Sequence, residues 1–354
     1  MTNLLEIKHL NISFEIHGKK LEAIRDVSFK LRSGETLALV GESGSGKSVT
    51  TKAITRLLAE NAHIDSGEIF LDGKDLLQLN MKEMDAVRGS DISMIFQDPM
   101  TALDPTMTIG RQVERAVAQH TRLDTRLGKT RLRDEAIDLL DKVGIPNPSS
   151  RLKNYPHQLS GGLLQRVVIA IALAGNPRIL IADEPTTALD VTIQAQIIAL
   201  LNSLKAKLNM SIIFITHDLG VVAEIADRVA VMYAGKIVEY GSLNDIFYNP
   251  KHPYTWALLS AMPTTETNGE ELFTIPGNPP KIGQFPIGDA FAQRNQYATK
   301  KDYEEQPPFF EVSPGHQAAT WLLDKDAAPV TPPKEILKRA AIYQAYQQDK
   351  EKGV

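Results

Sequence analysis

The residues that decide the fold are Gly41-Glu42-Ser43-Gly44-Ser45-Gly46-Lys47-Ser48. They fit the phosphate-loop pattern, in which two glycines separated by four residues precede a Lys and a hydroxyl residue. The apolar stretch 36–40 before them predicts a short buried strand, and residues 49–58 after them predict a helix. A glycine-rich turn that matches by chance is the alternative. It is disfavoured because strand, loop and helix occur in the order that the motif requires, so we predict a nucleotide-binding site.

This loop predicts a defined set of contacts with a nucleotide. Glycines let backbone N–H groups surround phosphate oxygens, and the start of the following helix adds partial positive charge. Lys47 is expected to reach the β- and γ-phosphates, and the Ser48 hydroxyl to bind Mg²⁺. Phe14 can stack on a base, although packing within a sheet is the commoner role of an aromatic residue. The predicted ATP-binding residues are Gly41, Ser43, Gly44, Ser45, Gly46, Lys47, Ser48, Val49 and Phe14.

Length and composition limit the remaining possibilities. The 354 residues are enough for two domains, or for one domain with a large appendage. The net charge of -4 offers no basic field, so we expect no nucleic-acid partner. The chain has no cysteine, which excludes disulfides, thiolate metal sites and cysteine nucleophiles. Residues 1–6 do not resemble a signal peptide, and the strongest apolar stretch, 167–174, is too short to cross a bilayer, so we expect membrane association through a partner.

Sequence periodicity predicts an α/β fold. Residues 5–8 and 23–29 predict two strands joined through Gly18. Further strands are predicted at 67–73, 92–96, 179–182, 211–215 and 228–232, and helices at 133–143, 191–208 and 219–226, with another ending at Leu173. Strands that alternate with helices predict a parallel sheet covered by helices.

Two other regions differ in character. Residues 98–175 are mainly helical and long enough to form a subdomain. Residues 263–333 are rich in proline and predict an irregular extension with little regular structure. Residues 333–352 predict a polar helix with Ile336, Leu337, Ala340 and Tyr343 on one side.

Asp183 and Glu184 directly follow the predicted strand 179–182. An Asp at the end of a buried strand is placed to hold Mg²⁺. Glu184, one position later, is in reach of a water aligned on the γ-phosphate. An Asp-Glu pair alone is weak evidence, but in a chain with a phosphate loop we interpret it as catalytic.

Four further elements resemble ATP-binding cassette (ABC) proteins. Leu159-Ser160-Gly161-Gly162 with Gln165-Arg166 resembles their signature motif, whose glycines open a helix that can bind phosphate. Gln97 matches their Q-loop, His217 their switch histidine, and Ala188-Leu189-Asp190 their D-loop. Each has a plainer explanation: a helix cap, a surface amide or a core histidine. Because all occur in the family's order, the chain is identified as a member.

The resemblance implies a fold and an assembly. It implies an α/β P-loop (RecA-like) nucleotide-binding domain over 1–260, with an antiparallel β subdomain and a helical signature subdomain at about 98–175. Two such domains would pair head to tail, with each ATP held between one phosphate loop and the partner's signature. The implied site residues are Glu184, His217 and Gln97 for catalysis, Ser48, Gln97 and Asp183 for Mg²⁺, Ser160, Gly161, Gly162 and Gln165 for the partner's ATP, and Asp190 in the D-loop.

A narrower resemblance is to the ATP-binding subunits of oligopeptide, dipeptide and nickel importers. It rests on residues 96–105, 252–259 and 275–280, and implies an extension over 261–325 and a tail over 326–354. Leu163, where many cassette proteins have Gln, is a mild departure. The implied partners are a paralogous ATPase, two membrane permease subunits and, indirectly, an extracellular peptide-binding protein, with this chain on the cytoplasmic face of the membrane.

The implied function is ATP hydrolysis that energises oligopeptide import. Import of dipeptides, nickel or another small solute is the nearest alternative. A non-transport ABC ATPase acting on ribosomes or DNA is the alternative of a different class. It is disfavoured because the chain has one phosphate loop and no long coiled coil.

Related importer subunits often carry four cysteines that resemble an iron–sulfur site, and this chain departs from them. Their positions hold Asp289, Asn295, Asp302 and Thr320. Iron–sulfur clusters need thiolates, so we expect none. Oxygen side chains can suit a hard cation, but we favour polar surface residues. We expect packing alone to order the extension, through a small satellite core of Phe285, Phe291, Phe309, Phe310, Trp321 and Leu322.

Overall fold

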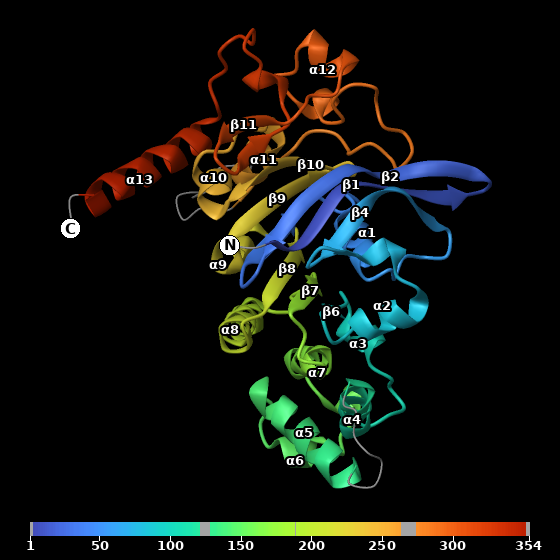
Figure 1. Ribbon diagram of the computed structural model, residues 1–354. Coiled ribbons are helices and arrows are strands. Elements are labelled where there is room, and N and C mark those ends of the chain that lie inside the picture. The colour runs from blue at the N-terminus through green and yellow to red at the C-terminus, as the bar shows by residue number, and fades with distance from the viewer. Residues whose placement is uncertain (1–2, 121–127, 188, 263–273, 352–354) are drawn as a thin grey trace. The chain divides into compact units, whose positions relative to one another are not determined.

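The computed structural model describes residues 3–120, 128–187, 189–262 and 274–351 (Figure 1). Ala188 of the predicted D-loop, residues 263–273 of the predicted extension and the two ends of the chain lie outside the described residues. The chain divides into two compact units. The first is Met1–Leu5, Leu31–Thr36 and Leu71–Ile215, and the second is Glu6–Lys30, Leu37–Phe70 and Thr216–Val354. The phosphate loop and the C-terminal extension therefore belong to the same unit.

The strands are β1 (Asn3–Ile16), β2 (Lys19–Arg32), β3 (Thr36–Val40), β4 (Ala62–Leu71), β5 (Lys74–Asp75), β6 (Ile92–Ile95), β7 (Ile179–Asp183), β8 (Ser211–Thr216), β9 (Arg228–Tyr233), β10 (Lys236–Ser242), β11 (Phe310–Ser313) and β12 (His316–Ala318). The α-helices are α1 (Lys47–Ile54), α2 (Met81–Val87), α3 (Pro99–Ala102), α4 (Ile109–His120), α5 (Gly128–Lys142), α6 (Pro148–Arg151), α7 (Gly161–Leu173), α8 (Val191–Leu208), α9 (Leu219–Ile225), α10 (Leu243–Tyr248), α11 (Pro253–Ser260), α12 (Lys300–Glu304) and α13 (Lys334–Glu351). Short 3₁₀ turns lie at Leu76–Gln78, Pro156–Gln158, Ala292–Arg294 and Trp321–Leu323.

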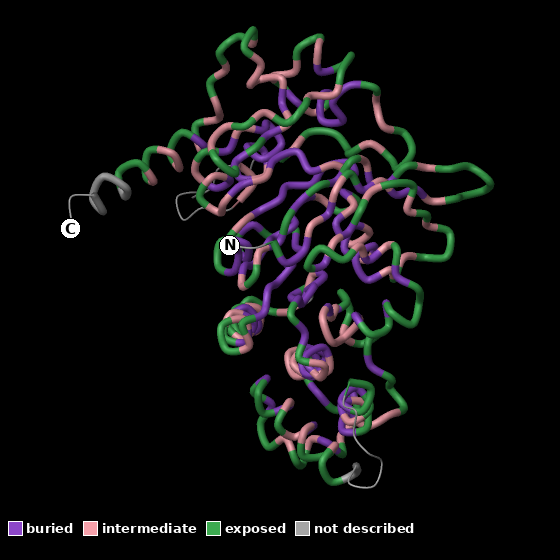
Figure 2. The backbone as a smooth tube through the Cα atoms, in the orientation of Figure 1, coloured by how far each residue is buried: buried purple, intermediate pink, exposed green. Residues whose placement is uncertain are grey.

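The first unit contains the parallel strands β6, β7 and β8. Ile92 pairs with Ile179, and Ile179 pairs with Ser211. The apolar runs of β7 and β8 form strands that are buried on both faces, as is usual in parallel sheets, and Figure 2 shows both buried along their length. Helices α4 to α7 group together, and α7 also packs against β6 and α8 (Figure 1). These elements confirm the predicted α/β fold with parallel strands and a helical stretch.

The second unit contains a mixed sheet with the strand order β11-β12-β10-β9-β3. Strands β3 and β9 are parallel, while the β9–β10, β10–β12 and β11–β12 pairs are antiparallel. The predicted extension is thus wrong in one respect, because its hairpin β11–β12 continues this sheet through the Glu239–Ala318 pair. The hairpin could not be recognised in the sequence, because β12 has only three residues and is too short to show an alternating strand pattern.

A separate four-stranded sheet, with the order β2-β1-β4-β5, corresponds to the β subdomain implied by the family resemblance. Strands β1 and β2 are 14 residues each, so the predicted segments 5–8 and 23–29 are too short. His9 and Asp26 have positive φ values of 48° and 53°, which interrupt the alternation without ending the strands. The His9 Nδ1 atom lies 2.6 Å from the Asp26 Oδ1 atom, so the two irregularities face each other.

Several element boundaries differ from the prediction. Helix α1 ends at Ile54 rather than at residue 58, because Arg56 has a φ of 51° and cannot continue a right-handed helix. Strand β10 and helices α2, α10 and α11 were not predicted. Tail helix α13 buries Ile336 and stacks Tyr343 on Tyr248, whereas Leu337, predicted on the same side of the helix, is 45% exposed. The packed stripe is narrow, and residues 336 and 343 lie seven apart on one helix face.

The predicted satellite core is only partly correct. Phe291 is fully buried and joins the main core of the second unit, where its ring centroid lies 5.3 Å from those of Tyr233 and Tyr254. Phe285 and Leu322 pack against the same core, whereas Phe309 is 44% exposed. The extension is therefore folded onto the core of its unit instead of forming a separate one.

Asp289, Asn295, Asp302 and Thr320 are all buried, so their predicted surface location is wrong. Each side chain accepts a hydrogen bond from a nearby backbone N–H group: Asp289 from Phe291, Asn295 from Tyr297, Asp302 from Thr299 and Thr320 from Leu322. Packing alone does not order the extension, because these residues stabilise four successive turns. Among the described residues, no group of three or more His, Asp or Glu side chains has the arrangement of a metal site.

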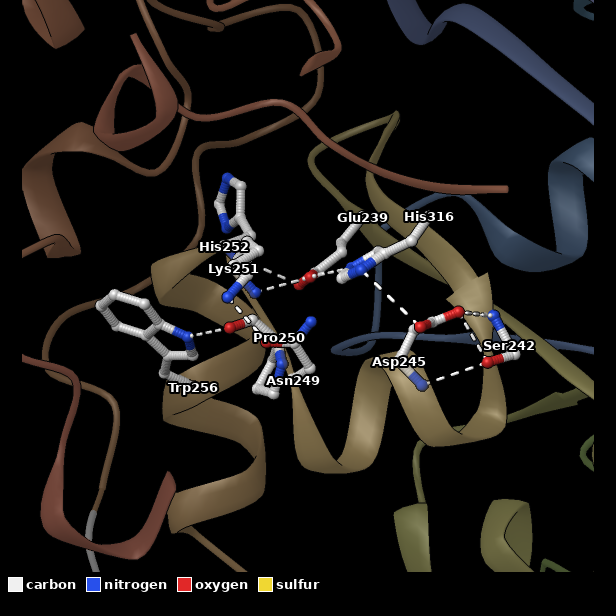
Figure 3. Close-up of polar contacts among 9 residues, drawn as sticks. All are labelled: Glu239, Ser242, Asp245, Asn249, Pro250, Lys251, His252, Trp256 and His316. Carbon is white, nitrogen blue, oxygen red and sulfur yellow. Dashed lines mark hydrogen bonds and ion pairs between the residues drawn. The ribbon is translucent and has the colours of Figure 1, made fainter. Parts of the chain in front are cut away.

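A buried polar cluster joins the extension to β10 (Figure 3). The Glu239 carboxylate accepts hydrogen bonds from the backbone N–H groups of Lys251 (2.6 Å) and His252 (3.1 Å), just before α11. His316 Nε2, from β12, lies 2.9 Å from Glu239 Oε1. A buried carboxylate needs several partners of this kind. Glu239 therefore connects a strand, a helix start and the hairpin of the extension.

Candidate functional site

The phosphate loop, residues 41–48, is fitted closely to the β9–β10 turn. Gly41 has a φ of 153°, and a Cβ atom there would clash with the carbonyl oxygen of Met232. The Gly235 N–H group donates a 2.9 Å hydrogen bond to the Ser45 carbonyl. At position 41, only glycine can adopt this φ value and avoid the clash with Met232, which explains why the motif has glycine there.

Lys47 and Ser45 carry the polar atoms that fit a phosphate. The buried Lys47 ammonium donates hydrogen bonds to the carbonyl oxygens of Gly41 (2.7 Å) and Glu42 (3.0 Å), so it lies within its own loop. The Ser45 hydroxyl is buried and has no hydrogen-bond partner among the described residues. Ser43 and Gly44 are exposed, and Gly46 precedes the first turn of α1. An ammonium, an orphaned hydroxyl and a helix start together fit the phosphates of a nucleotide.

Glu42, the second residue of the loop, has partners that sequence reasoning missed. Its N–H group donates a 2.9 Å hydrogen bond to the Tyr254 hydroxyl, and its carboxylate forms two bonds with the Arg294 guanidinium. Burial raises the pKa of Tyr254, so its hydroxyl remains protonated. Arg294 lies 252 positions from Glu42, and no motif in the sequence connects them.

In the first unit, Glu184 is held at the end of β7. It has a φ of 47°, an uncommon backbone conformation for a residue other than glycine, which costs on the order of 1 kcal/mol or more. Gln97 Nε2 donates a 3.2 Å hydrogen bond to Glu184 Oε2, and Thr187 Oγ1 donates a 3.0 Å bond to the same oxygen. The structure thus brings together two of the three predicted catalytic residues. His217 belongs to the second unit and is exposed just after β8.

Of the predicted Mg²⁺ ligands, Asp183 is buried as the last residue of β7. A carboxylate at a strand end and the Ser48 hydroxyl at a helix start are both oxygen donors, which suit a hard cation. Gln97 offers its amide oxygen, because its amide nitrogen is the atom that faces Glu184. The donor types therefore fit Mg²⁺ bound to a nucleotide.

The signature residues lie at the start of α7. Ser160 is exposed at the N-cap position and makes no side-chain capping bond, and Gly161 is also exposed. A Cβ atom on Gly162 would lie 2.7 Å from Ile193 Cγ2, so glycine allows close packing against α8. Gln165 is 1% exposed, which contradicts the predicted contact of its side chain with a partner's ATP. Its position on the inner side of α7 could not be read from the motif.

Asp190 has a clear structural role, and Phe14 lies in a strand. Asp190 caps α8, since its Oδ1 atom accepts a 3.0 Å hydrogen bond from the Ile193 N–H group. A cap of this kind contributes about 1 kcal/mol to stability. Phe14 is half-buried in β1, so its predicted contact with a base and its packing in the sheet both stay predictions. Within the described part of the chain, no helix is long and apolar enough to cross a membrane.

Comparison with known families supports the class that this architecture indicates. Residues 24–187 match the ABC transporter family, and residues 238–301 match the C-terminal region of oligopeptide/dipeptide transporters. The fold and these matches define an ABC ATPase. The chain is 56% identical to the oligopeptide transport ATP-binding protein OppD of Bacillus subtilis (strain 168), over 95% of this chain and 93% of that protein. It belongs to the family of oligopeptide and dipeptide transport ATP-binding proteins.

Other relatives agree with this assignment. The dipeptide transport ATP-binding protein DppD of Lactococcus lactis subsp. cremoris (strain MG1363) is 54% identical, over 98% of this chain and 99% of that protein. Among solved structures, the dimeric ATP-binding cassette MJ0796 in a post-hydrolysis state with ADP and Pi is 28% identical. The two structures superpose with a TM-score of 0.60, and the match covers 68% of this chain and 98% of the MJ0796 chain. The cassette fold is therefore confirmed.

Proposed function

We propose that this chain is the ATP-hydrolysing subunit that energises oligopeptide import through a membrane ABC transporter. The single observation that supports it best is the arrangement at β7, where Gln97 and Thr187 both orient the Glu184 carboxylate. The high similarity of nearly the whole chain to oligopeptide and dipeptide transport ATP-binding proteins is the second support for this proposal.

The proposed chemistry assigns a task to each side chain. Lys47 exchanges its bonds with the loop carbonyls for bonds to the β- and γ-phosphates, while the Ser45 hydroxyl and loop N–H groups bind the remaining oxygens. Glu184 accepts a proton from the water that attacks the γ-phosphorus, which yields ADP and phosphate. Mg²⁺ held by Ser48, Asp183 and Gln97 would neutralise phosphate charge. His217 is proposed to contact the γ-phosphate.

We further propose a head-to-tail pair with a paralogous ABC ATPase. Ser160 and Gly161 are exposed at the start of α7, where a partner's ATP is able to reach them. Two permease subunits would hold the chain at the cytoplasmic face of the membrane, and an extracellular binding protein would deliver the peptide. The proposed domains are 1–260, with a helical subdomain at about 98–175, the extension 261–325 and the tail 326–354. ATP binding closes the pair and hydrolysis reopens it.

Purified proteins provide the main test. The chain alone is expected to hydrolyse ATP slowly, and addition of the paralogue and permease in vesicles should raise the rate and drive uptake of labelled oligopeptides. Competition with dipeptides and nickel separates the alternative cargoes. Full turnover without the permease, or stimulation by ribosomes or DNA in its place, would instead support a non-transport ABC ATPase.

A further inference from the structure

Glu42 is an acidic residue inside a loop proposed to bind polyphosphate, and its carboxylate is paired with Arg294. Arg294 Nη1 lies 2.9 Å from Glu42 Oε2, and Nη2 lies 3.0 Å from Oε1. The Arg294 side chain is 6% exposed and that of Glu42 is 25% exposed. A two-pronged bond of this kind between a guanidinium and a carboxylate is both strong and geometrically specific. The contact therefore fixes the direction in which the carboxylate points.

Arg294 is itself held in place by the extension. Its Nε atom donates a 2.9 Å hydrogen bond to the Pro276 carbonyl, and Nη1 donates a 3.1 Å bond to the Tyr233 hydroxyl. The Arg294 N–H group bonds to the carbonyl of Phe291, which lies in the core of the unit. The guanidinium thus has little freedom to move away from Glu42.

The backbone of Glu42 is also held by hydrogen bonds. The Glu42 N–H group donates to the Tyr254 hydroxyl, and the Glu42 carbonyl accepts hydrogen bonds from Lys47 Nζ and from the Ser45 N–H group. Tyr254 packs at 4.6 Å from Tyr233, between ring centroids. A continuous set of contacts therefore runs from the extension through Glu42 to the lysine that would bind phosphate.

Charge gives this set of contacts a consequence for ATP. An unpaired carboxylate beside Gly41 would repel the phosphates of a bound nucleotide, and more strongly where water is partly excluded. Pairing with Arg294 cancels this charge and holds the side chain on the extension. Lys301, by contrast, is a cation of the extension that forms its 2.6 Å ion pair with Asp324.

We propose that Arg294 is a positioning residue for ATP binding, through which the C-terminal extension neutralises Glu42 and fixes the direction of its side chain away from the phosphates. This inference rests on the proposed phosphate-binding role of the loop. It gives the extension a direct effect on ATP affinity, in addition to any contact with other subunits.

The test compares ATP hydrolysis and binding by the assembled transporter. Arg294→Gln is expected to raise the KM for ATP by about tenfold while kcat changes less than about twofold. The double variant Glu42→Gln/Arg294→Gln is expected to recover most of the lost affinity, because the repelling charge is gone. The KM of Arg294→Lys should lie between those of the unmodified chain and Arg294→Gln, since lysine keeps the positive charge but cannot form two parallel hydrogen bonds with the carboxylate. The matched control Lys301→Gln removes a cation from the same extension and should leave KM unchanged.

Three outcomes would overturn the inference: an unaltered KM in Arg294→Gln, an equal change in Lys301→Gln, or no recovery in the double variant. The last would show that the Glu42 charge is not what weakens ATP binding in Arg294→Gln. If Arg294→Gln does not fold, Tyr254→Phe removes the hydrogen bond that the Glu42 N–H group donates to the Tyr254 hydroxyl, while it keeps the ring. It should still raise KM about threefold, and an unchanged KM there rejects the inference. Lys47→Ala separates a failure of this inference from a failure of the proposed function. If that variant retains its ATP affinity, the proposed phosphate-binding role of the loop is itself rejected.

Discussion

The side-chain amide of Gln97 donates a 3.2 Å hydrogen bond to the carboxylate of Glu184, although 87 positions separate them in the chain. Strands β6 and β7 bring them together, because Ile95 at the end of β6 pairs in parallel with Ala182 of β7. Residues that follow adjacent parallel strands meet at one edge of the sheet, where ligands of α/β folds commonly bind. A change at Gln97 is therefore transmitted directly to the proposed base.

Glu184→Gln is predicted to slow ATP hydrolysis by about a hundredfold or more while ATP still binds, since the amide keeps the size but cannot accept the proton. Phosphate release and nucleotide binding, measured separately, test this. Glu135→Gln on α5, which removes a surface carboxylate paired with Arg131, is the control and should change neither. An unaltered rate in Glu184→Gln would show that another group is the base.

Gln97→Ala is predicted to lower kcat by about tenfold, because Glu184 loses one of the two donors that orient it. The Mg²⁺ concentration needed for half-maximal activity should also rise if the Gln97 oxygen binds the ion. Titration of Mg²⁺ at saturating ATP measures both effects. Gln119→Ala, on the exposed end of α4, should behave like the unmodified chain. If Gln97→Ala and Gln119→Ala have the same kcat and the same Mg²⁺ requirement, Gln97 has no role in catalysis or Mg²⁺ binding.

His316→Phe is predicted to lower the free energy of unfolding by about 3 kcal/mol, because it leaves the buried Glu239 carboxylate without its ionisable partner. Urea unfolding of the isolated chain measures this. Lys300→Ala removes an exposed ion pair with Glu304 on α12 and should cost less than about 0.5 kcal/mol. A similarly small loss in His316→Phe would mean that the cluster in Figure 3 does not stabilise the extension.

Asp289→Asn is predicted to change how stability depends on pH. Burial, together with the nearby Asp302 carboxylate, raises the pKa of Asp289 from 3.8 to about 6, although the hydrogen bond from the Phe291 N–H group and the charges of Lys236 and Arg25 act to lower it. The folded state therefore holds this proton more tightly than the unfolded state, and its stabilising effect, present below pH 3.8, is lost as pH rises to 6. Asparagine does not titrate, so the variant should gain up to about 3 kcal/mol relative to the parent between pH 4 and 7. Urea unfolding at both pH values tests the sign, and a constant difference would contradict it.

The purified protein is predicted to be colourless and free of iron, because it has no cysteine to hold an iron–sulfur cluster. Elemental analysis after anaerobic purification measures this directly. One or more iron atoms per chain would contradict the prediction. The buried oxygen side chains of Asp289, Asn295, Asp302 and Thr320 would then need a role other than stabilising turns.

The sequence by itself determined the features that depend on local pattern. Helix α8 occupies the predicted residues 191–208, because its cap, its apolar periodicity and its C-terminal Asn209 are all local signals. Strand β3 and the phosphate loop were equally readable, since the loop is a contiguous motif whose chemistry requires those residue types.

Only the tertiary structure decided which distant residues meet. The pairing of Arg294 with Glu42, the burial of Gln165 and the addition of β11–β12 to the sheet of the phosphate loop have no local signature. The turns at Asp289 and Asp302 appeared to be surface because polar residues are usually exposed, yet backbone N–H donors satisfy them inside the extension. Contacts between residues far apart in the chain depend on how the elements pack, and a pattern within one segment does not contain that information.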